Sequence, residues 1–109
     1  MELSLKERVG VHLERAATSS AGRSAETLYG GQGHALRQTL IALRAGASLA
    51  EHESPGEATL LVLCGRVVLR SGAESWEGGR TDLLVIPPGR HSLEAVEESA
   101  ALLSVAKTD

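Results

Sequence analysis

Few side chains in this sequence have the types and spacing that catalysis requires. Ser54 follows His52 by two residues, but neither an orienting acid nor an oxyanion hole is visible, and serine at such a position is more typical of a turn. The single Cys64 lies in an apolar run, which favours a reduced, buried thiol over a nucleophile. Gly30–Gly33 lacks the Lys-Ser/Thr end and the following helix of a phosphate loop. No self-sufficient catalytic motif is therefore present.

Composition excludes several classes of partner. The 109 residues carry a net charge of −3 with no basic stripe, and the only aromatic residues are Tyr29 and Trp76. These features argue against nucleic acid and, more weakly, against a large sugar. No segment approaches the ~20 continuous apolar residues of a membrane span, and the first residues do not resemble a secretory signal. With one cysteine and no internal disulfide, we expect a cytoplasmic protein without a membrane partner.

A helix is predicted over residues 4–17, where Ser4 and Glu7 form a possible capping box. Apolar residues recur there at helical spacing: Leu5, Val9, Leu13 and Ala16. The opposite face is polar and includes His12, for which we predict a solvated side chain. We expect the helix to pack across an end or an edge of the remaining structure, or to reach a partner subunit.

From residue 25 onward the pattern changes to short strands separated by glycine and proline. The predicted strands are 25–29, 37–43, 49–51, 58–64, 66–70, 74–77, 83–86, 91–96 and 100–106. Many short strands with such punctuation indicate a sandwich or a barrel, and closure into a barrel removes exposed strand edges. We therefore predict one domain overall, with a helix and linker over 1–24 and an all-β barrel over 25–109.

Two segments within residues 34–106 resemble the paired motifs of the cupin superfamily. The first contains Gly, five residues and His, followed by a Leu-Val-Leu-x-Gly ending, and the second contains Pro-x-Gly-x-His. The matching positions are Gly46, His52, Gly65, Pro87, Gly89 and His91. The resemblance implies a double-stranded β-helix, or jelly-roll, barrel of six to eight strands. It also implies a dimer, which is common among such barrels, and an interior pocket that commonly holds a divalent metal.

The sequence departs from the cupin pattern at the positions that bind metal. Ser54 replaces the second histidine of the first motif, and the motif glutamate falls on Ala58. Glu57 is adjacent, but successive side chains of a strand point to opposite faces. In a regular strand Glu57 would point away from the pocket, whereas in a turn it could reach inward. Thr81 and Ala95 replace the glycine and the asparagine of the second motif.

The resemblance leaves His52 and His91 as candidate metal ligands, and Glu57 would complete a two-histidine, one-carboxylate site for Fe, Mn, Ni or Zn. Gln38 or His34 could instead supply the third ligand. Gln38 shares a face with Leu36 and Leu40, which would direct it into the barrel. Two protein ligands alone rarely hold such a metal. We slightly favour a barrel without metal, whose histidines hydrogen-bond polar neighbours or an organic anion.

Arginine offers a further binding group. Arg66, Arg70 and Arg90 could each bind a carboxylate through the guanidinium fork. Arg90 is the best candidate because it precedes His91 at a turn near the expected pocket mouth.

The resemblance and these candidate residues lead to three hypotheses about function. The first is binding of a small organic ligand by Gln38, His52, Arg90 and His91 in the barrel pocket, beside a degenerate metal site. The second is a metal-dependent dioxygenase or isomerase that uses His52, His91 and Glu57. The third is a structural or interaction module whose dimer face is the function. We expect a homodimer in each case, and the fold alone does not choose among them.

Overall fold

The computed structural model describes residues 1–53 and 56–107, and within them one helix precedes nine strands. The elements are α1 (Leu5–Thr18), β1 (Arg23–Gly30), β2 (Leu36–Leu43), β3 (Ser48–Glu53), β4 (Gly56–Cys64), β5 (Arg66–Ser71), β6 (Glu74–Gly79), β7 (Leu83–Val85), β8 (Arg90–Ala95) and β9 (Ser99–Lys107). Each predicted strand is present, although most boundaries shift by one to three residues, and β1 starts two residues earlier than expected. The predicted capping of the helix is confirmed on one side, since the Glu7 backbone N–H donates to Ser4 Oγ over 3.2 Å.

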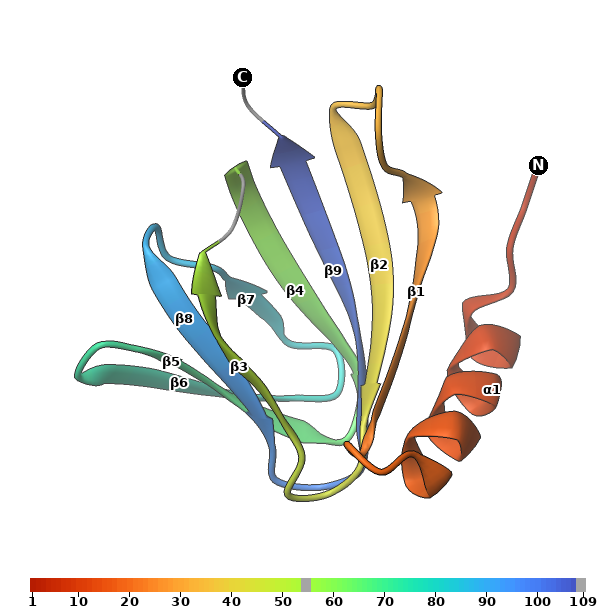
Figure 1. Cartoon of the computed structure of the whole chain (residues 1–109), viewed down its shortest axis with the longest axis horizontal. Helices are drawn as coiled ribbons and strands as arrows, with labels where there is room; N and C mark the ends of the chain where they lie inside the picture. The colour runs from red at the N-terminus through yellow and green to blue at the C-terminus, as the bar shows by residue number, and fades with distance from the viewer. Residues whose placement is uncertain (54–55, 108–109) are drawn as a thin grey trace.

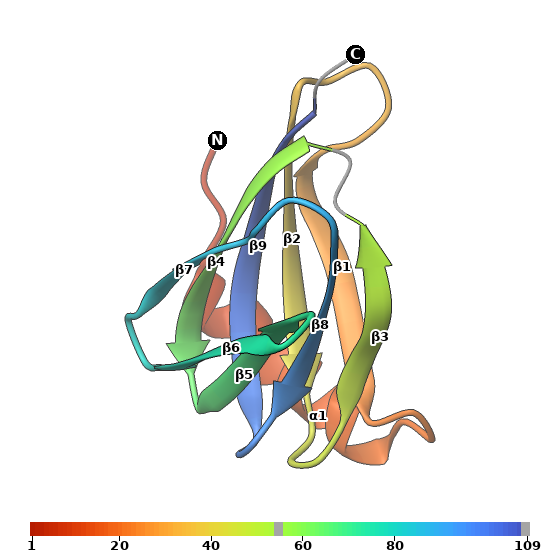
Figure 2. The same cartoon turned by 90° about the vertical axis from the view of Figure 1, so that its left-hand side faces the viewer.

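The strands form two antiparallel sheets that face each other. The larger sheet has the order β1-β2-β9-β4-β7, and the smaller has the order β3-β8-β5-β6. Figures 1 and 2 show the two sheets as opposite walls, with α1 outside the larger one. The predicted all-β barrel with one N-terminal helix is therefore confirmed. Of the helix positions that we expected, packing across an edge agrees best with the structure. The helix α1 contacts the edge strand β1, and also β2 and β9, on the outer face of the larger sheet.

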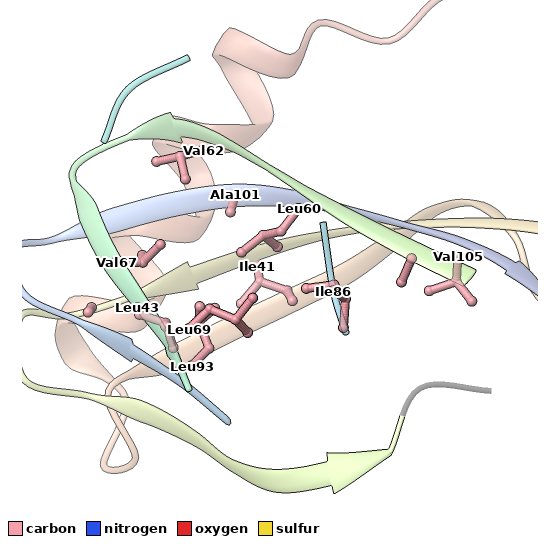
Figure 3. Packing of buried hydrophobic residues seen from close by; sticks show 12 residues of the cluster. Ile41, Leu43, Leu60, Val62, Val67, Leu69, Ile86, Leu93, Ala101 and Val105 are labelled. Carbon is pink, nitrogen blue, oxygen red and sulfur yellow. The ribbon is translucent and has the colours of Figure 1, made fainter. Parts of the chain in front are cut away.

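The core lies between the two sheets and is filled by aliphatic side chains from both (Figure 3). Strand alternation directs Ile41, Leu60 and Val105 inward from the larger sheet, and Leu69 and Leu93 inward from the smaller one. Figure 3 shows these side chains converging in the space between the walls. The outer positions of β4 are half-buried or exposed, so the apolar run of this strand is fully buried on one face only.

A buried histidine fastens α1 to the larger sheet. His12 is 1% exposed, so the prediction of a solvated side chain is wrong. Its Nε2–H donates to Glu26 Oε1 over 2.7 Å, and its Nδ1 lies 2.7 Å from Ser24 Oγ. Arg8 also donates to Glu26, from Nε over 3.1 Å. The hydrogen bonds from His12 and Arg8 lower the pKa of Glu26. A polar residue on the packed face of a helix is satisfied here by partners from β1, which helical periodicity alone does not reveal.

We predict that His12→Ala lowers the free energy of unfolding by about 2 kcal/mol, because it leaves a cavity and removes two hydrogen bonds. Urea denaturation followed by circular dichroism measures the loss. His34→Ala is the matched control, since His34 is exposed, and it should change the free energy by less than about 0.5 kcal/mol. Equal effects of the two substitutions would contradict the fastening role of His12.

The turn between β6 and β7 contains a strained residue. Thr81 has a φ of 70° and is the one non-glycine residue with positive φ in 1–53 and 56–107. A β-branched side chain is disfavoured in this region because its Cβ crowds the backbone. The conformation is held by the Thr81 N–H, which donates to the Val62 carbonyl over 2.8 Å. This is the position at which the cupin pattern has glycine.

Thr81→Gly should therefore raise the free energy of unfolding by about 1 kcal/mol, since glycine adopts positive φ without strain. Thr81→Ala keeps a Cβ and serves as the control, with a smaller gain expected. Thermal or urea unfolding distinguishes the two variants. A Thr81→Gly protein no more stable than the wild type would show that this φ carries no strain.

Candidate functional site

The pairing of β3 with β8 brings the two candidate histidines together. Leu49 lies opposite Leu93, and His52 lies opposite His91. Three positions separate the two residues on β3, whereas two separate their partners on β8, so β3 contains a bulge of one residue. Strict alternation from Leu49 would turn His52 outward. The extra residue reverses this and aims both Leu49 and His52 into the barrel.

The two imidazoles expose the same ring nitrogen. Their ring centroids are 4.5 Å apart, with an interplanar angle of 55°. His52 Nδ1 lies 3.0 Å from the Ala50 carbonyl oxygen, and His91 Nδ1 lies 3.4 Å from that of Gly89. A carbonyl oxygen only accepts hydrogen bonds, so each Nδ1 carries the proton. Each Nε2 is then unprotonated, and no residue of 1–53 or 56–107 donates a hydrogen bond to it.

Burial keeps one member of the pair neutral. His91 is 5% exposed, whereas His52 is exposed. Desolvation lowers the pKa of His91, the Gly89 carbonyl opposes this effect, and the nearby His52 adds to the lowering. The buried imidazole therefore remains a hydrogen-bond acceptor or metal ligand at neutral pH.

An apolar cavity of about 30 Å³ lies against this pair. Its lining consists of the two imidazoles and the aliphatic side chains of Ile41, Leu49, Leu60, Leu69, Ile86, Leu93 and Leu103. That volume suits a water molecule, whereas ligand pockets typically measure about 300–1,000 Å³. An organic ligand would therefore place only one group in the cavity. The rest of the molecule would lie toward the end of the barrel at which β3 ends and β8 begins.

Glu57 is not part of this site. It belongs to regular strand β4, is exposed, and lies opposite Ala106 on the face away from the buried Ala58. There it lines an external groove of about 310 Å³ that also contains Thr59 and Val85. Of the two orientations considered from the sequence, the structure shows the outward one. The carboxylate is therefore not brought together with His52 and His91.

The expected inward direction of Gln38 is wrong. Its Nε2 donates to Ser104 Oγ over 3.1 Å, and the face that it shares with the buried Leu40 is the one that packs under α1, outside the aliphatic core. The alternation of β2 was correct, but the sequence could not show which of its two faces is covered by a helix. Gln38 is therefore separated from the histidine pair by the sheet itself.

The remaining candidates also lie outside the cavity. Arg90 Nε donates to Glu51 Oε1 over 3.1 Å on the outer face of the smaller sheet, one residue from His91. His34 is exposed, and its ring meets the edge of Tyr29 at a centroid distance of 5.5 Å. Ser54 lies outside the described residues. Cys64 is a half-buried free thiol, more accessible than the fully buried thiol that was expected.

The donor set does not complete a metal site of the type that the cupin motifs imply. Within 1–53 and 56–107, no three His, Cys, Asp or Glu side chains converge on a common point. His52 and His91 supply two imidazoles, but tight transition-metal sites in proteins use three or four side chains. The described residues therefore do not by themselves form a three-ligand metal site.

Sequence reasoning missed Arg37. This residue lies opposite Val105 on β9, and Val105 is a core residue that is 1% exposed. Directly opposed residues share a face of the sheet, so Arg37 lies on the inner wall of the barrel. Arg37 shares a face of β2 with Ile41 and Leu43, because side chains alternate along a strand, and this was the signal available in the sequence. We had instead expected the other face of β2 to point into the barrel.

Comparison with solved structures identifies the architecture. The conserved SPY1581 protein of unknown function from Streptococcus pyogenes matches with a TM-score of 0.74 and 29% identity, over 84% of this chain and 79% of that one. A cupin superfamily protein from Desulfitobacterium hafniense matches with a TM-score of 0.72 and 18% identity, over 79% and 78%. A cupin 2 conserved barrel domain protein from Leptotrichia buccalis matches with a TM-score of 0.71 and 24% identity, over 82% of this chain and 43% of that one.

Other comparisons add no assignment. No protein-family model and no curated protein matches the sequence. The one helix in 1–53 and 56–107 is neither long enough nor apolar enough to cross a membrane.

The lowered pKa of His91 predicts a pH-dependent stability. The unfolded chain, with a histidine pKa near 6.5, binds the proton more readily than the folded protein. The contribution of His91 to the free energy of unfolding should therefore be fully present above pH 6.5. It should be lost as the pH drops from 6.5 to the pKa of His91 in the folded protein. Urea unfolding between pH 7.5 and 5.5 measures this slope. It should be shallower in His91→Gln and unchanged in His34→Gln, and an equal slope in wild type and His91→Gln would contradict the assignment.

Proposed function

We propose that this small cupin-fold protein reversibly binds a small organic molecule at the histidine end of its barrel, without requiring a resident metal. The observation that carries the proposal is the pair of inward-facing imidazoles, whose Nε2 lone pairs adjoin an apolar cavity. Ligand sites of this kind combine an aliphatic wall with a few polar groups that fix orientation. The pair is therefore the polar anchor, and the surrounding leucines are the wall.

The geometry defines what the anchor recognises. An imidazole Nε2 that carries no proton accepts hydrogen bonds, so the complementary group is an O–H or N–H donor. A hydroxyl fits the water-sized cavity of about 30 Å³, and Leu49 and Leu93 would pack against the adjoining carbon atoms. A buried acceptor left unpaired loses about 1–3 kcal/mol, which penalises analogues that lack the donor. The expected ligand is thus apolar in body and carries at least one donor.

A matched pair of neutral probes tests this function. We predict that 4-hydroxyacetophenone binds more tightly than acetophenone, because only the former carries a hydrogen-bond donor, its phenolic hydroxyl, for the imidazoles. Titration followed by chemical shifts of the histidine Cε1–H groups measures both affinities. His91→Ala and His52→Ala should abolish the difference between the probes, and His34→Ala should preserve it. Equal affinities in the wild type, or no saturable shift with either probe, would overturn the proposal.

The metal-independent part of the proposal has its own control. Protein purified without affinity metal and treated with chelator should bind 4-hydroxyacetophenone as the untreated protein does, and elemental analysis should show less than one metal per chain. Stoichiometric Fe, Mn, Ni or Zn, lost in the His52→Ala and His91→Ala variants together with binding, would contradict it and favour a metal-dependent enzyme.

A further inference from the structure

We propose that Arg37 binds a carboxylate, so that the barrel selects small organic acids which also carry an O–H or N–H donor. The inference rests on the proposed function, because it adds a second anchor to the same site. Arg37 takes the carboxylate-binding role that we predicted for Arg90, whose guanidinium lies on the outer face and pairs with Glu51.

The register of the larger sheet places Arg37 beside the cavity. Thr39, two residues further along β2, lies opposite Leu103, and Leu103 lines the cavity. Two residues of a strand span about 6.7 Å, so Arg37 lies one inward-facing row beyond the cavity lining. Figure 1 shows that β2 begins at the same end of the barrel at which β3 ends and β8 begins. Arg37 and the histidine pair therefore occupy opposite walls near one end.

The guanidinium of Arg37 has no partner among the described residues. Among the described residues, the arginines that form ion pairs are Arg8, Arg66, Arg70 and Arg90, each with a glutamate. Arg37 makes no hydrogen bond or ion pair with any residue of 1–53 or 56–107, although it is half-buried on the inner wall. A partly desolvated charge without a partner loses the hydrogen bonds that water would give it, which is unfavourable in free energy. A carboxylate from a ligand would accept two parallel hydrogen bonds from the guanidinium and so compensate for this loss.

A ligand that reaches both anchors must span the space between the two walls. The walls diverge toward the end at which β2 begins (Figure 1), and the long side chain of Arg37 can extend part of the way across. A single small molecule can then place its donor on the imidazoles and its carboxylate on Arg37. The combination favours a compact hydroxy or amino acid with an apolar body over a neutral molecule of the same shape.

Three probes separate the two anchors. We expect 4-hydroxybenzoate, which carries both groups, to bind at least about tenfold more tightly than 4-hydroxyacetophenone, which lacks the charge. Benzoate lacks the donor and should also bind more weakly than 4-hydroxybenzoate. Titrations monitored at the histidine Cε1–H groups and at the Arg37 Nε–H give the three affinities.

Substitutions assign each preference to its residue. Arg37→Gln should reduce the affinity for 4-hydroxybenzoate to that for 4-hydroxyacetophenone while leaving the latter unchanged, and Arg37→Lys should restore part of the difference. Arg70→Gln is the matched control, because Arg70 pairs with Glu94 on the outer face, and it should keep the full preference. Thermal unfolding of each variant verifies that the fold is retained.

The outcomes distinguish failure of this inference from failure of the proposed function. If 4-hydroxyacetophenone binds through the histidines but 4-hydroxybenzoate binds no more tightly, or if Arg37→Gln preserves the acid preference, the role of Arg37 is wrong and the histidine site stands. If none of the three probes produces a saturable shift, the proposed function and this inference both fall.

Discussion

One extra residue in β3 determines whether this barrel has an interior polar site. The bulge between Leu49 and His52 turns His52 toward His91, which lies directly opposite on β8. A one-residue change of register moves every following side chain to the other face of a sheet. Without the bulge, His91 would be left without His52 beside it on the inner face of the smaller sheet. The pairing of the two imidazoles, the lining of the cavity and the orientation of any ligand depend on this local irregularity.

The scaffold could be predicted because turns and alternation leave clear traces in a sequence. Gly65 shows why, since it has a φ of 83° and a Cβ there would lie 2.2 Å from the Glu98 carbonyl oxygen. Gly46 and Gly89 also adopt positive φ, at 85° and 91°. Residue types with such requirements are conspicuous in a sequence. The strand pattern and the barrel follow from them together with the apolar runs.

The site was less predictable because alternation does not say which face is inside. Gln38 and Leu40 share one face of β2 while Arg37 and Ile41 share the other, and either could have faced the barrel. The helix decided the matter by covering the face of Leu40, which is fully buried outside the aliphatic core. His12 was misassigned for the same reason, since its partners Ser24 and Glu26 belong to another element. Pairings between distant segments determine these placements.

The protonation pattern of the histidine pair is the most direct test of this account. Long-range ¹H–¹⁵N correlation spectra of ¹⁵N-histidine-labelled protein at pH 7.5 report which ring nitrogen of His52 and of His91 carries the proton. The account predicts the Nδ1–H tautomer for both, because each Nδ1 lies against a backbone carbonyl oxygen at 3.0 and 3.4 Å, respectively. An Nε2–H tautomer at His91 would contradict it, because the pair would then present a donor at His91 instead of two acceptors.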